Sequence, residues 1–474
     1  MSRIWGMMDV GKRSLMNSQT ALQTVSHNVA NKSTEGYSRQ RVEVQSNVPV
    51  GNGKLRIGMG ARASAVTRVN NPYLEKQVEK EGNELGFAQA RSESLARVEQ
   101  VYNEQVNKGL NKFMAEFFNG FRELSNNPEG LAARTLVKES ADFLAKDFKR
   151  VHDQLTDIQK DIDFQIVNHV VEINGLTKEI ADLNEKVQIV ELNGAHANDE
   201  RDRRDLLIKK LSEMVNIRYA EGDDGTVAIT AGDNAVLVSG QSYREMFTSS
   251  TEGKPGKREG NIEVFYRPTE SGTPVNVTRQ FRSGKLGGLL DVRDKVANGL
   301  LDHMDNMAYT LASEVNKIHT QGFDRYNKKG EGFFVMPESV KDASQTLQVN
   351  HSILNDVGRI VAGASLNAPG DNRIANILSS LQYKPVFDGT NSFDNYYNSI
   401  VGEIGVEASR ANSEHESQKN IVKQLENIRE SISGVSLDEE TAKMIEFQKN
   451  FDASARLIRT ADEMMDTVLN LKRL

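Results

Sequence analysis

Cysteine is absent from the 474-residue sequence. Its absence excludes disulfides, thiolate metal sites and a cysteine nucleophile. Proline and tryptophan are scarce, with 9 and 1 copies, and a chain poor in helix breakers is suited to long helices. The net charge is −7. Because binding to phosphates requires a basic surface, we expect no nucleic-acid partner.

Long hydrophobic runs are also missing. The mean hydropathy is −0.53, and no run approaches the ~20 apolar residues of a membrane span. We therefore expect no membrane partner. The first residues, MSRIWGMMDVGKRSLM, lack the continuous apolar core and the small-residue cleavage site of a secretory leader. If the protein leaves the cell, we expect an export route that does not depend on a cleaved leader.

Enzyme signatures such as HExxH, GxSxG, a Walker loop or a Rossmann glycine run do not occur in the sequence. His319 and Asp324 could suggest a metal or acid–base pair, but a helix end capped by Gly322 explains them better. Asp223 and Asp224 could suggest calcium, yet a turn between strands accounts for them because no ladder of oxygen ligands follows. We expect no catalytic residue, no metal and no cofactor.

The last 35 residues before the terminus, 437–471, contain neither glycine nor proline. Their apolar residues recur every seven positions, which predicts a helix with apolar rows that pack on a partner helix. At about 1.5 Å per residue this helix would be roughly 50 Å long. The residues expected at its assembly interface are Leu437, Met444, Phe447, Phe451, Ile458, Met465 and Val468.

Residues 1–31 predict a matching helix, which we expect to pair with residues 437–471. The small residues Gly11 and Ser18 would let the facing helix come close. Both helices carry more apolar rows than one helix pair needs, so we expect neighbouring subunits to complete their burial. In the free monomer the two terminal helices should be loosely ordered. The residues expected at the assembly interface here are Met8, Leu15, Leu22, Val25 and Val29.

Between the two ends, the periodicity predicts a mainly α protein with one β insert. Helices are expected over 71–126, 131–193, 284–315, 373–382 and 401–432, and strands over 41–45, 217–220, 226–230, 235–238, 262–266 and 275–281. The expected architecture is a set of nested layers. Residues 1–41 and 436–474 form a terminal coiled-coil polymerisation domain, 42–215 and 284–435 a helical-bundle rod, and 216–283 a small inserted antiparallel β domain.

The charged run 198–212 invites a catalytic interpretation, but its spacing favours a solvated helix face. Opposite charges fall four residues apart, which predicts exposed ion pairs worth a few tenths of a kcal/mol each. The expected pairs are Asp199/Arg203, Glu200/Arg204 and Arg201/Asp205.

Two stretches at opposite ends of the chain resemble the signatures of the flagellar rod, hook and hook-associated protein family. Residues 28–40 (NVANKSTEGYSRQ) resemble the amino-terminal signature, and residues 433–471 resemble the carboxy-terminal one. Segments 198–212, 284–294 and 316–324 resemble the hook-associated members in particular. The signature residues at the amino-terminal end are Asn28, Asn31, Thr34, Gly36, Tyr37, Ser38 and Arg39.

The resemblance implies a structural protein of the bacterial flagellum that forms the junction between hook and filament and a base for flagellin assembly. It implies self-assembly into a ring. It also implies contacts with the hook protein, the second hook–filament junction protein, an export chaperone and the type III export apparatus. The implied location is extracellular, on the flagellum.

Two alternatives stay open. A hook or distal rod protein would share both signatures, although the many central helices argue against it because hook proteins are mainly β between their ends. An enzyme carried on the flagellum would have its activity in residues 216–283.

Overall fold

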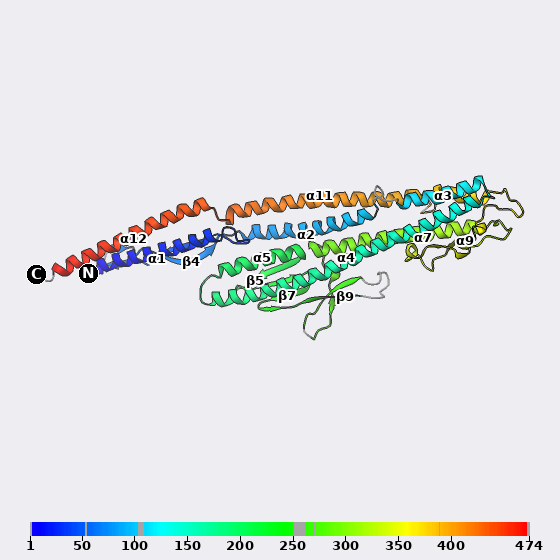
Figure 1. Cartoon of the computed structure of the whole chain (residues 1–474). Helices are drawn as coiled ribbons and strands as arrows, with labels where there is room; N and C mark the ends of the chain where they lie inside the picture. The colour runs from blue at the N-terminus through cyan, green and yellow to red at the C-terminus, as the bar shows by residue number, and fades with distance from the viewer. Residues whose placement is uncertain are drawn as a thin grey trace.

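The computed structural model describes residues 2–52, 55–102, 109–250, 261–269, 271–387 and 389–471. The molecule is elongated, and both chain ends lie together at one end of it (Figure 1). Long helices run along its length, and short strands and turns occupy the opposite end and one side. This arrangement confirms the mainly α class predicted from the periodicity.

The rod consists of long helices that pack side by side. The longest is α4 (Leu131–Leu192), and it confirms the helix predicted over 131–193. The other members are α2 (Pro72–Val101), α3 (Leu110–Asn126), α5 (Asn198–Met214), α6 (Gly284–Asp291), the π-helical turn η2 (Val292–Ala297), α7 (Asn298–His319) and α11 (Phe393–Ser433). Their buried faces carry the apolar stripes seen in the sequence, so burial of these stripes holds the bundle together.

Three expected elements differ from the structure. The single helix predicted over 71–126 is wrong, because α2 ends at Val101 and Gly109, in an extended conformation, caps the start of α3. The helix predicted from 401 begins at Phe393, where the Ser392 side chain accepts from the backbone N–H of Asn395. The strand predicted over 275–281 is short, and a 3₁₀ turn (Thr278–Gln280) follows it.

The β insert consists of two small antiparallel sheets that pack on α4. The predicted hairpin is confirmed by the pairing of β5 (Ile217–Glu221) with β6 (Val227–Ala231). Its turn contains Gly225 at φ +76°, and Asp224 accepts from both the backbone N–H and the hydroxyl of Thr226. The remaining strands are β7 (Ala235–Ser239), β8 (Ser242–Tyr243), β9 (Met246–Ser250), β10 (Ile262–Tyr266) and β11 (Val275–Asn276).

Short elements and loops fill the end of the rod that lies opposite the chain termini (Figure 1). A cluster of phenylalanine rings from α3 and from the segment that follows α7 forms the core there. The short elements are β12 (Phe334–Val335), α8 (Ala343–Thr346), β13 (Gln348–Val349), α9 (His351–Asn355), η3 (Val357–Arg359), α10 (Arg373–Ser380) and η4 (Leu381–Tyr383).

The terminal layer has three parts. Helices α1 (Ser2–Ala30) and α12 (Leu437–Leu471) confirm the two predicted terminal helices, and they pack on each other. A hairpin of β1 (Gln40–Ser46) and β4 (Ala61–Arg68) also packs on α1, and β2 (Val50–Asn52) pairs with β3 (Leu55–Ile57) beyond it. The sequence predicted only the first of these strands.

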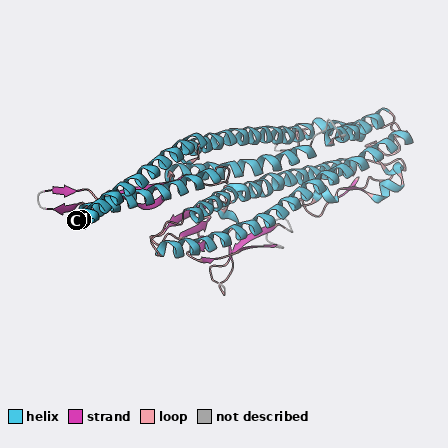
Figure 2. Ribbon diagram, turned by 60° about the vertical axis from the view of Figure 1, so that its left-hand side comes forward, coloured by secondary structure: helices cyan, strands magenta, loops and turns pink. Residues whose placement is uncertain are grey.

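These strands lie beside the terminal helices at the end of the molecule (Figure 2). The expected domain boundary after residue 41 falls inside this hairpin. Within the described ranges, no helix combines the length and the apolar character needed to cross a membrane.

Candidate functional site: the terminal helix pair and its elbow

Small residues allow α1 and α12 to approach each other closely. A Cβ atom at Gly11 would lie 2.8 Å from side-chain carbons of both Leu457 and Ile458, so glycine permits the close approach predicted for this position. Further along, the Ser454 hydroxyl donates to the Ser14 hydroxyl at 2.7 Å. Ala461 is fully buried. The two helices therefore meet where small residues, Gly11, Ser454 and Ala461 among them, allow a close approach, and the large apolar side chains of Leu457 and Ile458 lie against Gly11.

The residues expected at the assembly interface lie around this contact and remain partly open to solvent. Val25 is buried, whereas Leu437 and Val468 are exposed. The half-buried ones are Met8, Leu15, Leu22, Val29, Met444, Phe447, Phe451, Ile458 and Met465. Apart from Val25, the apolar rows of both helices therefore keep surface that one subunit does not bury.

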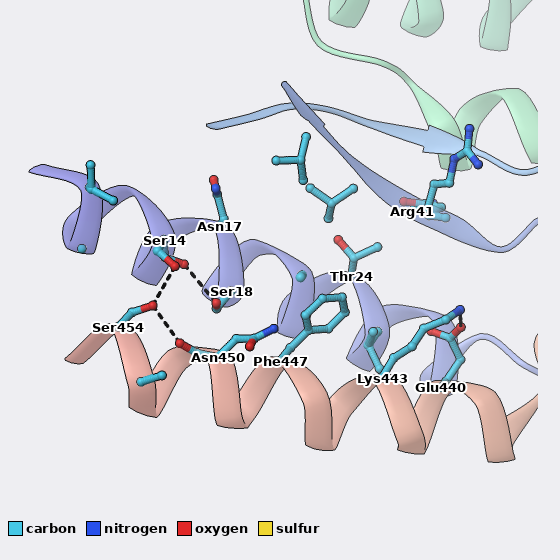
Figure 3. Close-up of a pocket in the computed structure, with 18 of the residues that line it drawn as sticks. Ser14, Asn17, Ser18, Thr24, Arg41, Glu440, Lys443, Phe447, Asn450 and Ser454 are labelled. Atoms are coloured by element: carbon cyan, nitrogen blue, oxygen red, sulfur yellow. Dashed lines mark hydrogen bonds and ion pairs between the residues drawn. The ribbon is translucent and has the colours of Figure 1, made fainter. Parts of the chain in front are cut away.

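A groove of about 730 Å³ lies between α12 and β1, over α1. Figure 3 shows side chains from all three elements around it, with Phe447 of α12 lying toward α1. Its walls combine apolar carbon with hydroxyl and amide groups. The labelled lining residues are Ser14, Asn17, Ser18, Thr24, Arg41, Glu440, Lys443, Phe447, Asn450 and Ser454.

Asn28 is the centre of an elbow where the terminal layer meets the rod. Its side chain is buried and makes four hydrogen bonds. Nδ2 donates to the Gln40 carbonyl and to Glu440 Oε2, both at 2.9 Å. Oδ1 accepts from the Tyr37 hydroxyl at 2.8 Å and from the Gln40 backbone N–H at 2.9 Å. One amide therefore joins α1, β1 and the first turn of α12.

The neighbouring signature residues connect this elbow to the end of α11 and the start of α12. The backbone N–H of Arg39 donates to the carbonyl of Ser433, the last residue of α11, and its guanidinium pairs with Glu439 at 2.7 Å. Burial raises the pKa of Tyr37, and the nearby carboxylates act in the same direction. The hydroxyl of Tyr37 therefore stays protonated and keeps donating to Asn28.

The other signature residues shape the turn after α1. Asn31 Nδ2 donates to the His27 carbonyl at 3.1 Å, and the Thr34 hydroxyl donates to Asn31 Oδ1 at 3.1 Å. Gly36 has φ +79°, a conformation that residues with a Cβ rarely adopt, and Leu206 of α5 lies against it. These contacts give the amino-terminal signature a structural reason.

The charged run 198–212 attaches the elbow to the rod. Asp202 is buried, accepts from the Ser38 backbone N–H at 2.8 Å and pairs with Arg68 at 2.7 Å. Arg68 also pairs with Asp205 at 2.8 Å. Burial raises the pKa of Asp202, while Arg68 and Ser38 act in the opposite direction. A buried carboxylate joined to Arg68 and Ser38 is a fixed joint rather than a solvated face.

The prediction of exposed ion pairs within this run is wrong. Of the three expected pairs between residues 199 and 205, none forms in the described part of the chain. Arg204 is almost fully buried and donates to the Gly225 carbonyl at 2.6 Å, and Arg203 pairs with Glu179 of α4. Because α5 packs between α2 and α4, its charged side chains lie next to residues of other elements. They form hydrogen bonds and ion pairs with those residues instead of with each other.

A second polar cluster lies in the rod. His152, Asp305 and Asp342 form the one group with metal-like spacing among the residues that the structure describes. His152 Nδ1 lies 2.9 Å from the Ser344 hydroxyl, which in turn donates to Asp305. Burial by itself would raise the pKa of Asp305, but hydrogen bonds from His152, Ser344 and Asp342 lower it to about 2. The cluster joins α4, α7 and the loop before α8.

His319 does not pair with Asp324. It is fully buried, its Nδ1 donates to the Glu331 carbonyl at 2.6 Å, and its Nε2 accepts from the Val361 backbone N–H at 3.0 Å. Asp324 instead accepts from backbone N–H groups of its own loop. The imidazole therefore holds two loops against the end of α7.

A long helical rod, an inserted β domain and one layer made from both chain ends define an elongated, mainly helical protein built around its paired termini. Comparison with known families adds a specific assignment. Residues 95–334 match the model described as the flagellar hook-associated protein FlgK helical domain. Residues 430–471 match the carboxy-terminal model of the flagellar basal body rod FlgEFG proteins.

Curated relatives agree along almost the whole chain. Flagellar hook-associated protein 1 of Bacillus subtilis is 28% identical, over 98% of this chain and 97% of its own length. The protein of the same name from Salmonella typhimurium is 25% identical, over 96% and 97%. The chain belongs to the flagellar hook-associated protein FlgK family.

A solved structure has the same fold. The flagellar hook junction protein FlgK from Burkholderia pseudomallei aligns with a TM-score of 0.67 at 14% identity, covering 75% of this chain and 100% of that one.

Proposed function

We propose that the paired terminal helices are the surface through which copies of this chain assemble into a ring. The family gives the chain a structural role at the hook–filament junction of the flagellum. The observation that supports the terminal layer as the assembling part is its incomplete burial. Of the α12 side chains that the structure describes, Glu440, Ser454 and Ala461 alone are buried in the single chain.

Helix α12 leaves apolar surface uncovered in the single chain. The 35-residue helix α12 buries only a few of its side chains in one subunit and leaves many of its large apolar ones partly or fully exposed. Each Å² of apolar surface that an assembly removes from water stabilises the assembly by about 25 cal/mol. An assembly in which neighbouring copies cover these apolar rows would therefore be more stable than the separate monomers.

In this proposal the three expected domains have different tasks. Residues 1–41 and 436–474, together with the hairpin 42–68, form the assembling layer. The helices within 69–215 and 284–435 form a stiff rod, and the β insert 216–283 extends from one side of it. The protein acts as a scaffold and not as an enzyme.

The proposed partners follow from the family. They are further copies of the chain, the hook protein, the second hook–filament junction protein, and an export chaperone that accompanies the chain to the type III export apparatus.

A deletion mutant viewed by electron microscopy tests the role. We expect hooks without filaments, with flagellin lost to the medium. Absent hooks would instead indicate a hook or distal rod component. A catalytic screen of the purified full chain addresses the enzyme alternative, and activity that depends on residues 216–283 would favour it.

Point variants test the surface. Phe451→Asp and Ile458→Asp place a charge in the apolar rows, and we expect normal secretion with loss of incorporation at the hook tip. Thr460→Asp adds the same charge at an exposed polar position of α12 and is the matched control. Normal filaments on the Phe451→Asp strain would contradict the proposal.

A further inference from the structure

Arg134 differs from the other buried arginines of the rod. Among the described residues three arginines are buried, Arg134, Arg204 and Arg293, with exposed fractions of 3%, 1% and 0%. Arg293 pairs with Asp163 at 2.7 Å, and Arg204 pairs with Glu221 at 3.3 Å. Arg134 has no carboxylate within ion-pair distance in the part of the chain that the structure describes. A buried cation without an acidic partner is costly, because it has lost its hydration and gained no opposite charge.

Backbone carbonyls satisfy the Arg134 guanidinium only in part. Its Nη1 donates to the Ile360 carbonyl, and its Nη2 donates to the Pro128 carbonyl at 2.8 Å. The buried Nε has no acceptor within the described ranges. Burial lowers the pKa of Arg134 to about 10, and the charge of Arg325 acts in the same direction, while Asp324 opposes it. The group is therefore still a cation at neutral pH, with a charge that its surroundings do not match.

A pocket of about 190 Å³ borders this side chain. Its walls come from three chain segments, 128–134, 323–327 and 362–371, which belong to the end of the rod opposite the chain termini (Figure 1). The volume is several times the ~30 Å³ that one water occupies. It is below the roughly 300 Å³ at which pockets for drug-sized ligands begin. The pocket therefore fits a small ion with a few waters.

Two more hydrogen-bond donors line the pocket. The Arg325 side chain is exposed and, within the described residues, forms no ion pair. The Ser365 hydroxyl oxygen accepts from Arg373, which leaves its own O–H group to donate. With Arg134, the pocket wall carries two guanidinium groups and one hydroxyl that can each donate to a bound anion.

The carboxylates of the pocket wall already have partners or lie at the surface. Asp371 accepts from Arg373 at 2.8 Å and from two backbone N–H groups at 2.9 Å. These hydrogen bonds, led by the one from Arg373, hold the pKa of Asp371 below its usual range. Asp324 accepts from two backbone N–H groups of its own loop, both at 2.8 Å. Glu129 is exposed. None of the three therefore neutralises the Arg134 guanidinium by direct contact.

We propose that this pocket binds a small oxyanion, of phosphate or carboxylate type, between the guanidinium groups of Arg134 and Arg325 and the hydroxyl of Ser365. The planar guanidinium matches the paired oxygens of both types. A bound anion would give Arg134 the opposite charge that the chain does not supply. It would also connect the start of α4 to the loops 323–327 and 362–371, and so stiffen this end of the rod.

Titration of the purified full chain with sodium phosphate, sodium acetate or sodium chloride at equal ionic strength tests the site. We expect phosphate or acetate to bind in calorimetry and to slow hydrogen–deuterium exchange in peptides covering 322–330 and 358–372, with chloride inactive. The anion that binds more tightly identifies the type. Failure of both phosphate and acetate to bind would overturn the proposal, and so would equal protection by chloride, which would indicate charge screening only.

A pair of matched variants locates the binding. Replacing Arg134 would also release the two carbonyls that it holds, so the test uses Arg325→Gln. This change should weaken binding at least about tenfold, the effect of losing one hydrogen bond to a charged group. Lys328→Gln removes the same charge from an exposed position of the same loop, outside the pocket wall, and should leave the affinity unchanged. Unchanged binding by Arg325→Gln, or an equal loss in both variants, would overturn the assignment.

Discussion

Replacing Asn28 by alanine is the most informative single change, because its amide connects both chain ends. Asn28→Ala removes the partners of the Gln40 N–H and C=O groups and of the Tyr37 hydroxyl. Glu440 also loses a donor, but it retains Lys443 at 2.8 Å. A buried polar group left without a partner costs about 1–3 kcal/mol.

Two backbone groups of Gln40 cannot turn to find new partners, so we expect local destabilisation of about 3 kcal/mol. At about 1.4 kcal/mol per factor of ten, this is a roughly 150-fold increase in opening of the elbow. Hydrogen–deuterium exchange of the purified full chain measures it directly. Peptides covering 38–46 and 433–446 should lose protection, whereas peptides from α4 should not change.

Gln23→Ala is the matched control. Gln23 is exposed on the same helix, and an exposed substitution of this kind should change stability by less than about 0.5 kcal/mol. Unchanged exchange at residues 433–446 in Asn28→Ala would refute the reasoning, because it would mean that the amide does not couple the ends.

Three further predictions follow from the structure. Gly11→Leu should separate α1 from α12, because even a Cβ there lies 2.8 Å from Leu457 and Ile458; faster exchange along both helices checks it, and Gly6→Leu, with open space around it, is the control. His319 should make the rod acid-sensitive, because burial lowers its pKa to about 4, and the charge of Arg134 adds to this effect. The unfolded chain gains this proton below about pH 6.5 and the folded chain does not, so the free energy of unfolding should fall by about 2 kcal/mol between pH 7 and pH 5. His319→Gln should reduce this loss in urea titrations, and an equal loss in both proteins would contradict the assignment. Finally, the backbone amides at the tips of α1 and α12 should exchange hydrogen rapidly in the dilute monomer and become protected on assembled hooks. Strong protection of both tips in the monomer would contradict the expectation that the terminal helices are loosely ordered.

Much of the fold could be predicted because helices and strands leave periodic patterns. The seams of α4 and α12 and the hairpin of β5 and β6 were readable from spacing alone. The break between α2 and α3 was missed because Gly109 is a weak signal inside a long apolar pattern. Strand β4 was missed although ARASAVTR alternates, because small residues give alternation little contrast.

The elbow could be predicted only in part. Its signature residues stood out as a group, but their partners lie about 400 residues away in the chain, as with Asn28 and Glu440. The role of the charged run was misjudged for the same reason. Its i, i+4 spacing fits an isolated helix, whereas Asp202 and Arg204 are buried against other elements and take partners from them.

The sequence by itself determined that the chain ends are two long helices with apolar rows at a period of seven, because that period is a property of the helix. Only the tertiary structure decided which residues make their contact. Small residues such as Gly11 and Ser454 allow the helices to approach closely, Leu457 and Ile458 pack against Gly11, and other large apolar residues, Phe451 among them, stay only half-buried. Close packing of two backbones depends on the side chains that face each other across the contact, and no pattern within one helix contains that information.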